Sequence, residues 1–179
     1  MLLRWVLVGC CAVALLACCS CANRAGGGGQ PAITVTSPAF QEGGAIPKKY
    51  TQDGENVSPP LAWSGVPAEA KALALIVRDP DAPGSDFVHW IVYNLPPTTT
   101  ELPEAAPVLP APGAEGTNDA GKLGYVGPAP PSGTHRYYFT VYALDGQLDL
   151  QTGADKRQVR DEMSGHILAE GALMGTYRR

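Results

Sequence analysis

The stretch "HRYYFTVYAL", residues 135–144, gives the clearest strand signal in the chain. It is built mainly from aromatic and β-branched residues, which are enriched in β-strands. Successive side chains of a strand point to opposite faces, so His135 and Tyr137 share one face with Phe139 and Val141. The stretch therefore predicts a strand whose core face begins with two polar groups.

Other apolar or alternating runs, each bounded by turn residues, extend the β prediction. They occupy residues 32–36, 71–78, 88–95 and 172–178. The run 71–78 is nearly continuous in apolar residues, which indicates a central strand buried on both faces. In 88–95 the same alternation predicts that His89 shares its face with Ile91 and Tyr93.

The remaining segments predict loops and one helix. Residues 96–116 contain six prolines without an apolar period, which predicts a long surface loop. Val159, Met163 and Ile167 are spaced by four, as on one face of an amphipathic helix, and Thr152 with Asp155 resembles a capping box. His166 is expected beside that apolar stripe, as a core or boundary residue. The predicted fold is mainly β, a sandwich or pair of sheets with one C-terminal helix.

The N-terminal residues have the features of an exported lipoprotein. Residues 1–17 combine one arginine with an apolar run that is too short to span a bilayer, which is typical of a signal peptide. "LLAC", residues 15–18, resembles a bacterial lipobox and predicts lipid modification of Cys18, with Cys21 as the open alternative. Residues 18–31 are then a flexible tether, and residues 32–179 form the folded domain. We expect a location in the bacterial cell envelope, with membrane attachment through the lipid.

Composition excludes several classes of protein. The formal net charge is −4 and no basic run occurs, so binding to nucleic acid through phosphate contacts is not expected. All five cysteines lie between residues 10 and 21, so a disulfide framework cannot hold the domain together. A chain of 179 residues suits one domain with a hydrophobic core.

Polar residues gather where the predicted strands begin and end, in two loops and two strand starts. They are Asp79, Asp81 and Pro83 in "DPDAP", His89, Gly127 in a Gly-Pro loop, and His135 with Tyr137. Singly, each suits a turn or an exposed strand end. Two histidines with a carboxylate could hold a metal, but no familiar metal-ligand spacing is present. A nucleophile elbow is absent, and the two aspartates are too close in sequence for the separated acids of a glycosidase.

A pocket for a small anion suits these residues better. Imidazole N–H groups, the Tyr137 hydroxyl and backbone N–H groups at glycines such as Gly127 can donate hydrogen bonds to an anion. Prolines supply rigid apolar walls and reduce the ordering cost of binding. Asp79 and Asp81 would orient the histidines and favour their charged form. No cofactor and no metal is expected in this interpretation.

Three ordered motifs support a family resemblance. They are "DPDAP" followed by "HW", "GYVGPAPPSGTHRYYFTVYAL" (124–144), and "GENVSPPLAW" (54–63), with "GHILAEGALMGTYRR" (165–179) at the end. Together they resemble the phosphatidylethanolamine-binding protein (PEBP) family, in its bacterial Raf-kinase-inhibitor-like branch. The resemblance covers residues 32–179.

The resemblance implies a β-sandwich with a small anion pocket for phosphate-type headgroups. It places Asp79, Asp81, Pro83, His89, Gly127, His135 and Tyr137 at that pocket, and it implies a cis bond between Asp79 and Pro80. The expected function is non-catalytic binding of a small anion or phospholipid headgroup. Two alternatives stay open: a protein inhibitor of a kinase or protease, with an unknown protein partner, and an unrecognised hydrolase or metal-dependent enzyme.

Overall fold

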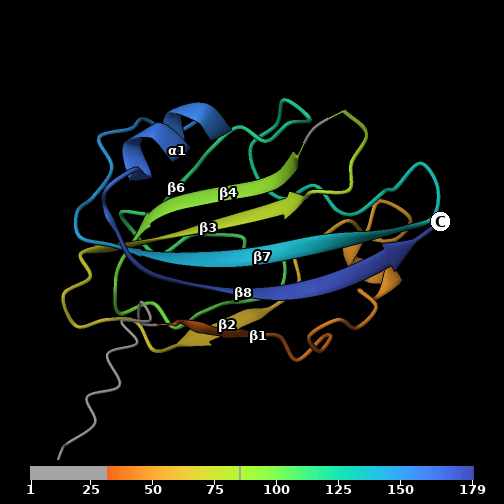
Figure 1. Cartoon of the computed structure of the whole chain (residues 1–179), viewed down its shortest axis with the longest axis horizontal. Coiled ribbons are helices and arrows are strands. Elements are labelled where there is room, and N and C mark those ends of the chain that lie inside the picture. Colours follow the sequence, from red (N-terminus) through yellow and green to blue (C-terminus); the bar gives the residue numbers. More distant parts are fainter. Residues whose placement is uncertain (1–31, 85) are drawn as a thin grey trace, which may run out of the picture.

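Two antiparallel sheets form the domain. The computed structural model describes residues 32–84 and 86–179. Within them, one sheet has five strands in the order β6-β4-β3-β7-β8, and the other has three in the order β1-β2-β5. Figure 1 shows the long strands of the larger sheet with helix α1 on one side and the smaller sheet on the other. The predicted fold class, mainly β with one C-terminal helix, is confirmed.

The middle of the larger sheet is the near-continuous apolar run. Strand β3 (Ala72–Asp79) pairs with β4 (Phe87–Leu95) on one side and with β7 (Thr134–Leu144) on the other. Its residues are almost all buried because both faces of the sheet are covered. The prediction of a central strand here is confirmed, and it brings Asp79, at the end of β3, beside the start of β7.

The edges of the sheets are made from short strands; the sequence predicted the one at 32–36, which is β1, but not the others. The smaller sheet contains β1 (Thr34–Thr36), β2 (Leu61–Ser64) and β5 (Glu101–Leu102). Strand β6 (Ala114–Glu115) forms one edge of the larger sheet beside β4. The prediction of an unbroken loop over 96–116 is therefore wrong, because two two-residue strands within it pair with neighbours. A 3₁₀ helix, η1 (Lys48–Tyr50), lies between β1 and β2.

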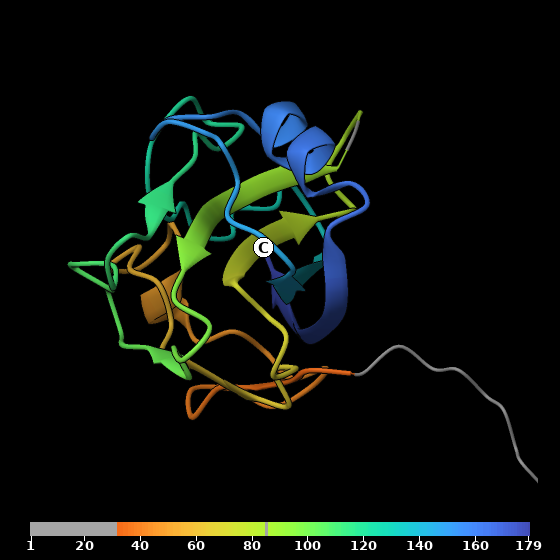
Figure 2. The same cartoon turned by 90° about the vertical axis from the view of Figure 1, so that its left-hand side faces the viewer.

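Two hydrophobic cores lie on the two faces of the larger sheet. Leu75, Val77 and Phe139 pack toward the smaller sheet, where they join Leu61 and Trp63. The other core fills the space under α1, and its members include Ala74, Ile91, Tyr93, Val159 and Met163. Figure 2 shows α1 and the smaller sheet on opposite sides of the larger sheet.

Helix α1 (Lys156–Met163) begins later and ends earlier than predicted. Its capping box uses Asp155 as N-cap and Gln158 as the reciprocal partner, so the expected pairing of Thr152 with Asp155 is wrong. Val159 and Met163 are buried as predicted, but His166 lies beyond the helix. His166 is exposed, and its Nδ1 lies 2.7 Å from Asp145 Oδ1.

Strand β8 (Ile167–Arg178) is much longer than the predicted strand 172–178. It pairs with β7 along its length, with a register shift near Leu144. Gly171 lies just before the predicted start, and β8 also contains Gly175. A Cβ at Gly171 would collide with the Ile33 carbonyl, and one at Gly175 would lie 2.6 Å from Ile46 Cγ1. The close approach of neighbouring segments explains why glycine stands inside this strand.

A β-bulge reorients His89. The register moves from Val77 opposite Trp90 to Arg78 opposite Val88, so His89 is the extra residue on β4. Ile91 and Tyr93 belong to the core under α1, whereas the His89 ring contacts Tyr137, a member of the opposite core. The predicted shared face of His89 with Ile91 and Tyr93 is therefore wrong. The bulge directs His89 toward the residues at the start of β7.

The predicted signal peptide (1–17) and tether (18–31), including Cys18 and Cys21, lie outside the described residues. Among the residues that the structure describes, no helix is long and apolar enough to cross a membrane.

Candidate ligand-binding pocket

A pocket of about 400 Å³ opens where β3 ends and β4 and β7 begin. It brings together five of the seven predicted site residues: Asp79, Pro83, His89, His135 and Tyr137. The remaining lining residues are Gln52, Ala82, Phe87, Ala129, Pro130, Pro131 and Arg179. This volume is typical of sites for small ligands.

The most tightly held pair in the pocket is Asp79 with His135. His135 Nδ1 lies 2.7 Å from Asp79 Oδ2, and both side chains are at least nine-tenths buried. Because a carboxylate accepts hydrogen bonds, Nδ1 carries the hydrogen and Nε2 is left for a ligand. The other oxygen, Asp79 Oδ1, accepts a hydrogen bond of 2.8 Å from the Asp81 backbone N–H. The predicted orienting role of Asp79 suits this geometry.

His89 is fixed differently, through a backbone carbonyl. Its Nδ1 donates to the Val126 carbonyl at 2.7 Å, so Nε2 is again the nitrogen that remains. The ring centroid lies 4.8 Å from that of Phe87 and 5.3 Å from that of Tyr137. Burial lowers the pKa of His89 below its ordinary value, 6.5, and the Val126 carbonyl and Asp79 offset only part of this effect. A neutral His89 at neutral pH differs from the expectation that the neighbouring carboxylates favour its charged form.

The Tyr137 hydroxyl is the unsatisfied group of the pocket. The side chain is 1% exposed, and its oxygen has no hydrogen-bond partner in the part of the chain that the structure describes. Burial raises the pKa of Tyr137 well above its ordinary value, and so do the Asp79 charge and a contact with that carboxylate whose geometry falls short of an ordinary hydrogen bond. The phenol is therefore protonated at neutral pH and can donate a hydrogen bond. A buried polar group without a partner is costly, which makes it a marker of a ligand position.

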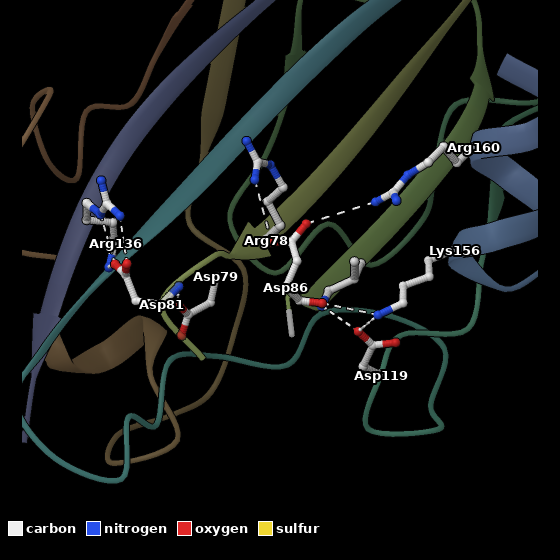
Figure 3. Close-up of polar contacts among 9 residues, drawn as sticks. Arg78, Asp79, Asp81, Asp86, Asp119, Arg136, Lys156 and Arg160 are labelled. Carbon is white, nitrogen blue, oxygen red and sulfur yellow. Dashed lines mark hydrogen bonds and ion pairs between the residues drawn. The ribbon is translucent and has the colours of Figure 1, made fainter. Parts of the chain in front are cut away.

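Asp81 does not face the two histidines. Its carboxylate accepts hydrogen bonds from the Arg136 backbone N–H, at 3.0 Å, and from Arg136 Nε and Nη2, at 2.8 and 2.6 Å. These bonds from Arg136 lower the pKa of Asp81 to about 2. Figure 3 shows Asp81 turned to Arg136 while Asp79 lies on the other side of the same turn. Asp81 therefore fastens the acidic loop to β7 and does not orient a histidine directly.

Gly127 is buried, but its N–H is already used. It donates to Asn56 Oδ1 at 2.7 Å, so the expectation that this group faces a ligand is not supported. A Cβ at this position would lie 2.6 Å from the Tyr50 carbonyl oxygen and 2.8 Å from Asn56 Oδ1. Gly127 therefore permits close packing of the Gly-Pro loop against residues 50–56.

The predicted cis bond at Asp79–Pro80 is wrong. Within residues 32–84 and 86–179, the cis peptide bond is Ala111–Pro112. The trans form carries the chain straight out of β3 into an Asx turn, in which the Asp81 N–H bonds to the Asp79 side chain. Pro83 still reaches the pocket wall.

Arg179 is a pocket residue that the sequence patterns did not indicate. Its Nε donates to Asp53 Oδ2 at 2.9 Å, and the Tyr177 hydroxyl donates to the same oxygen at 2.8 Å. Hydrogen bonds from Arg179 lower the pKa of Asp53 to about 2. The only sequence signal for Arg179 was its position directly after the predicted strand 172–178. In the structure this strand is part of β8, which pairs with β7. Arg179 therefore places a guanidinium, paired with Asp53, at the pocket lined by Tyr137 and His135.

The metal interpretation gains no structural support. Among the described residues, no group of three or more His, Cys, Asp or Glu side chains is arranged to hold a metal ion. Asp79 and His135 are engaged with each other, and His89 Nδ1 with a carbonyl.

Comparison with known proteins agrees with this fold and motif set. Residues 36–178 match the family model described as phosphatidylethanolamine-binding protein. The chain belongs to the PEBP family. A UPF0098 protein of Methanothermobacter thermautotrophicus is 56% identical over 150 residues, which cover 82% of this chain and 99% of that protein. A UPF0098 protein of Chlamydia trachomatis is 49% identical over 152 residues, with the same shares covered.

Solved structures agree as well. A putative PEBP homologue from Chlamydia trachomatis superposes with a TM-score of 0.78 at 47% identity, covering 83% of this chain and 99% of that one. Escherichia coli YbcL, described as a member of the mammalian PEBP family, gives a TM-score of 0.78 at 33% identity, covering 82% and 98%.

Proposed function

We propose that this PEBP-family protein binds a small oxyanion, a phosphate or a phospholipid headgroup, in the pocket around Asp79, His135 and Tyr137, without catalysis. The observation that carries the proposal is the buried Tyr137 hydroxyl, which lines the pocket and has no partner among the described residues. An oxyanion oxygen would accept its hydrogen bond. The family name, phosphatidylethanolamine-binding protein, agrees with a ligand of this type.

Several groups complement the hydroxyl. Arg179 lines the pocket with a guanidinium that is held by Asp53, and the two histidines retain Nε2 for a ligand. Ala82, Phe87, Pro130 and Pro131 form apolar walls that suit the methylene groups beside a headgroup. Because hydrogen bonds already fix the histidines, little ordering is needed when the ligand enters.

Calorimetric titration with phosphate and phosphoethanolamine tests the proposal. His135→Ala should weaken binding about ten- to a hundred-fold, the effect of a lost charged hydrogen bond. His166→Ala is the matched control, since His166 is exposed and pairs with Asp145 away from the pocket. Absence of binding by the unaltered protein would reject the proposal, and turnover of phosphatase, esterase or protease substrates would reject its non-catalytic part.

The proposal includes a location in the bacterial envelope, with a lipid on Cys18 as anchor. It is supported by the apolar leader and by "LLAC" at 15–18. Cys18→Ser should remove acyl labelling and shift the protein out of the membrane fraction, while Cys21→Ser should leave both unchanged. The opposite pattern would assign the lipid to Cys21, and no acylation of the unaltered protein would contradict the anchor.

A further inference from the structure

A second cavity, of about 260 Å³, lies on the opposite face of the larger sheet, beneath α1. Its apolar part is formed by Ile76, Val88, Met163 and Ile167. Asp86 lines this cavity, whereas the next residue, Phe87, lines the pocket around Tyr137. The two cavities are therefore separate spaces divided by the start of β4.

Three charged side chains surround the second cavity, and they are loosely paired. Asp86 Oδ1 lies 3.5 Å from Arg78 Nη1, and Asp86 Oδ2 lies 3.9 Å from Arg160 Nη2. Good guanidinium–carboxylate hydrogen bonds are about 2.7–2.9 Å long. Asp86 Oδ1 is buried and accepts no hydrogen bond from the described residues. Figure 3 shows Asp86 between the two arginines, which approach it from β3 and from α1.

The positions of these groups are set by neighbours that do not occupy the cavity. The Arg78 guanidinium lies 5.2 Å from the ring centroid of Tyr138, a stacking arrangement that restricts its movement. Lys156 Nζ donates to the Asp86 carbonyl at 3.1 Å and to Asp119 Oδ2 at 2.6 Å. Thus the Asp86 backbone is fixed to α1, and the Lys156 charge is matched by Asp119. Among the residues that the structure describes, the Asp86 carboxylate itself is held only by the two long ion pairs.

We propose that this cavity is a binding site for a small monocarboxylate with an apolar body, such as an aryl or short alkyl acid. The ligand carboxylate would accept hydrogen bonds from guanidinium N–H groups of Arg78 and Arg160 that the long ion pairs to Asp86 leave unused, and its apolar part would contact Met163 and Ile167. Two arginines and one aspartate leave one net positive charge, which a single carboxylate neutralises. Planar guanidinium groups match carboxylate geometry through paired N–H donors.

The Tyr142 side chain also lines the cavity. Burial raises the pKa of Tyr142 above its ordinary value, so the hydroxyl keeps its proton at neutral pH. The cavity volume is slightly below that of sites for drug-sized molecules, which favours a compact ligand.

The test uses phenylacetate as probe and follows backbone amide signals by NMR during a titration. We expect saturable shifts at residues 76–78, 86–88 and 160–167. Arg160→Gln should weaken the affinity about ten-fold, the effect of losing a charged hydrogen bond. Arg157→Gln is the matched control, since Arg157 is exposed on α1 and does not line the cavity. Asp86→Asn should bind more tightly, because it removes the internal competitor for both arginines.

Two further measurements complete the test. One separates the contribution of the ligand charge from that of its apolar body, and the other distinguishes binding in this cavity from binding in the Tyr137 pocket. Phenylethanol, which has the apolar body without the charge, should bind much more weakly than phenylacetate. Tyr137→Phe should leave the phenylacetate affinity unchanged, since Tyr137 lines only the pocket on the other face of the sheet. No saturable shift, shifts confined to the Tyr137 pocket, or equal affinity in Arg160→Gln would overturn the proposal.

Discussion

The two cavities on either side of the start of β4 use charge in opposite ways. In the pocket around Tyr137, Asp79 and His135 are buried and lie 2.7 Å apart. In the cavity under α1, Asp86 is about one-third exposed and lies 3.5 and 3.9 Å from its arginines. The first arrangement fixes side chains before a ligand arrives, and the second leaves charges that a ligand can rearrange. The comparison indicates that pairing distance and burial, rather than the mere presence of acids and bases, determine how firmly each cavity holds its charged side chains.

The largest expected difference between the cavities is in stability. Asp79→Ala should lower the free energy of unfolding by about 3–5 kcal/mol, because it leaves the buried His135 without its partner. Asp86→Ala should cost less than about 1 kcal/mol, as expected for a partly exposed pair. Urea unfolding of both variants measures this, and equal losses would show that the two acids are held alike.

A second variant tests whether the wall of the Tyr137 pocket is closely packed. Gly127→Ala should cost about 1–3 kcal/mol, because its Cβ would overlap the Tyr50 carbonyl and Asn56. Gly146→Ala is the control, since a Cβ there meets no atom within 4 Å. Thermal unfolding compares them. A Gly127 variant as stable as the control would mean that the loop yields easily and that the pocket is not preformed.

The smallest expected effect is the pH dependence of the free energy of unfolding. It concerns His89 in the Tyr137 pocket, because no histidine lines the cavity under α1. The pKa of His89 is lower in the folded protein than its ordinary value of 6.5. The unfolded chain therefore binds the proton more readily, and the free energy of unfolding falls as the pH falls through 6.5. His89→Gln removes this term, so the stability difference between the two proteins should shrink on acidification. A difference that grows on acidification would contradict the buried, neutral His89.

Much of the fold was predictable because burial on both faces leaves a strong pattern. The run 71–78 became β3, and the aromatic stretch 135–144 became β7, each within a residue. Val159 and Met163 predicted the late helix. Its N-cap was predicted at Thr152 instead of Asp155, because the sequence allows a capping box between Thr152 and Asp155 as well as one between Asp155 and Gln158. Only the fold shows which pairing forms.

The site was predicted in part, and the failures have physical causes. Asp79, His135 and Tyr137 come together because β3 and β7 are neighbours; both strands were predicted, but their pairing was not. The bulge at His89, the Arg136 partner of Asp81 and the Asn56 partner of Gly127 all depend on contacts between distant segments. Arg179 reaches the pocket because it follows β8, whose last residues pair with the start of β7, and the sequence did not predict this pairing.

The most direct test of the central claim is a calorimetric titration of phosphate into the unaltered protein and Tyr137→Phe, with urea unfolding of both. The hydroxyl lacks a partner among the described residues, so its removal should not lower the free energy of unfolding. The affinity for phosphate should fall about ten- to a hundred-fold, the effect of one lost hydrogen bond to a charged ligand. Equal phosphate affinity in the two proteins would contradict the account, because the unsatisfied hydroxyl would then have no part in binding.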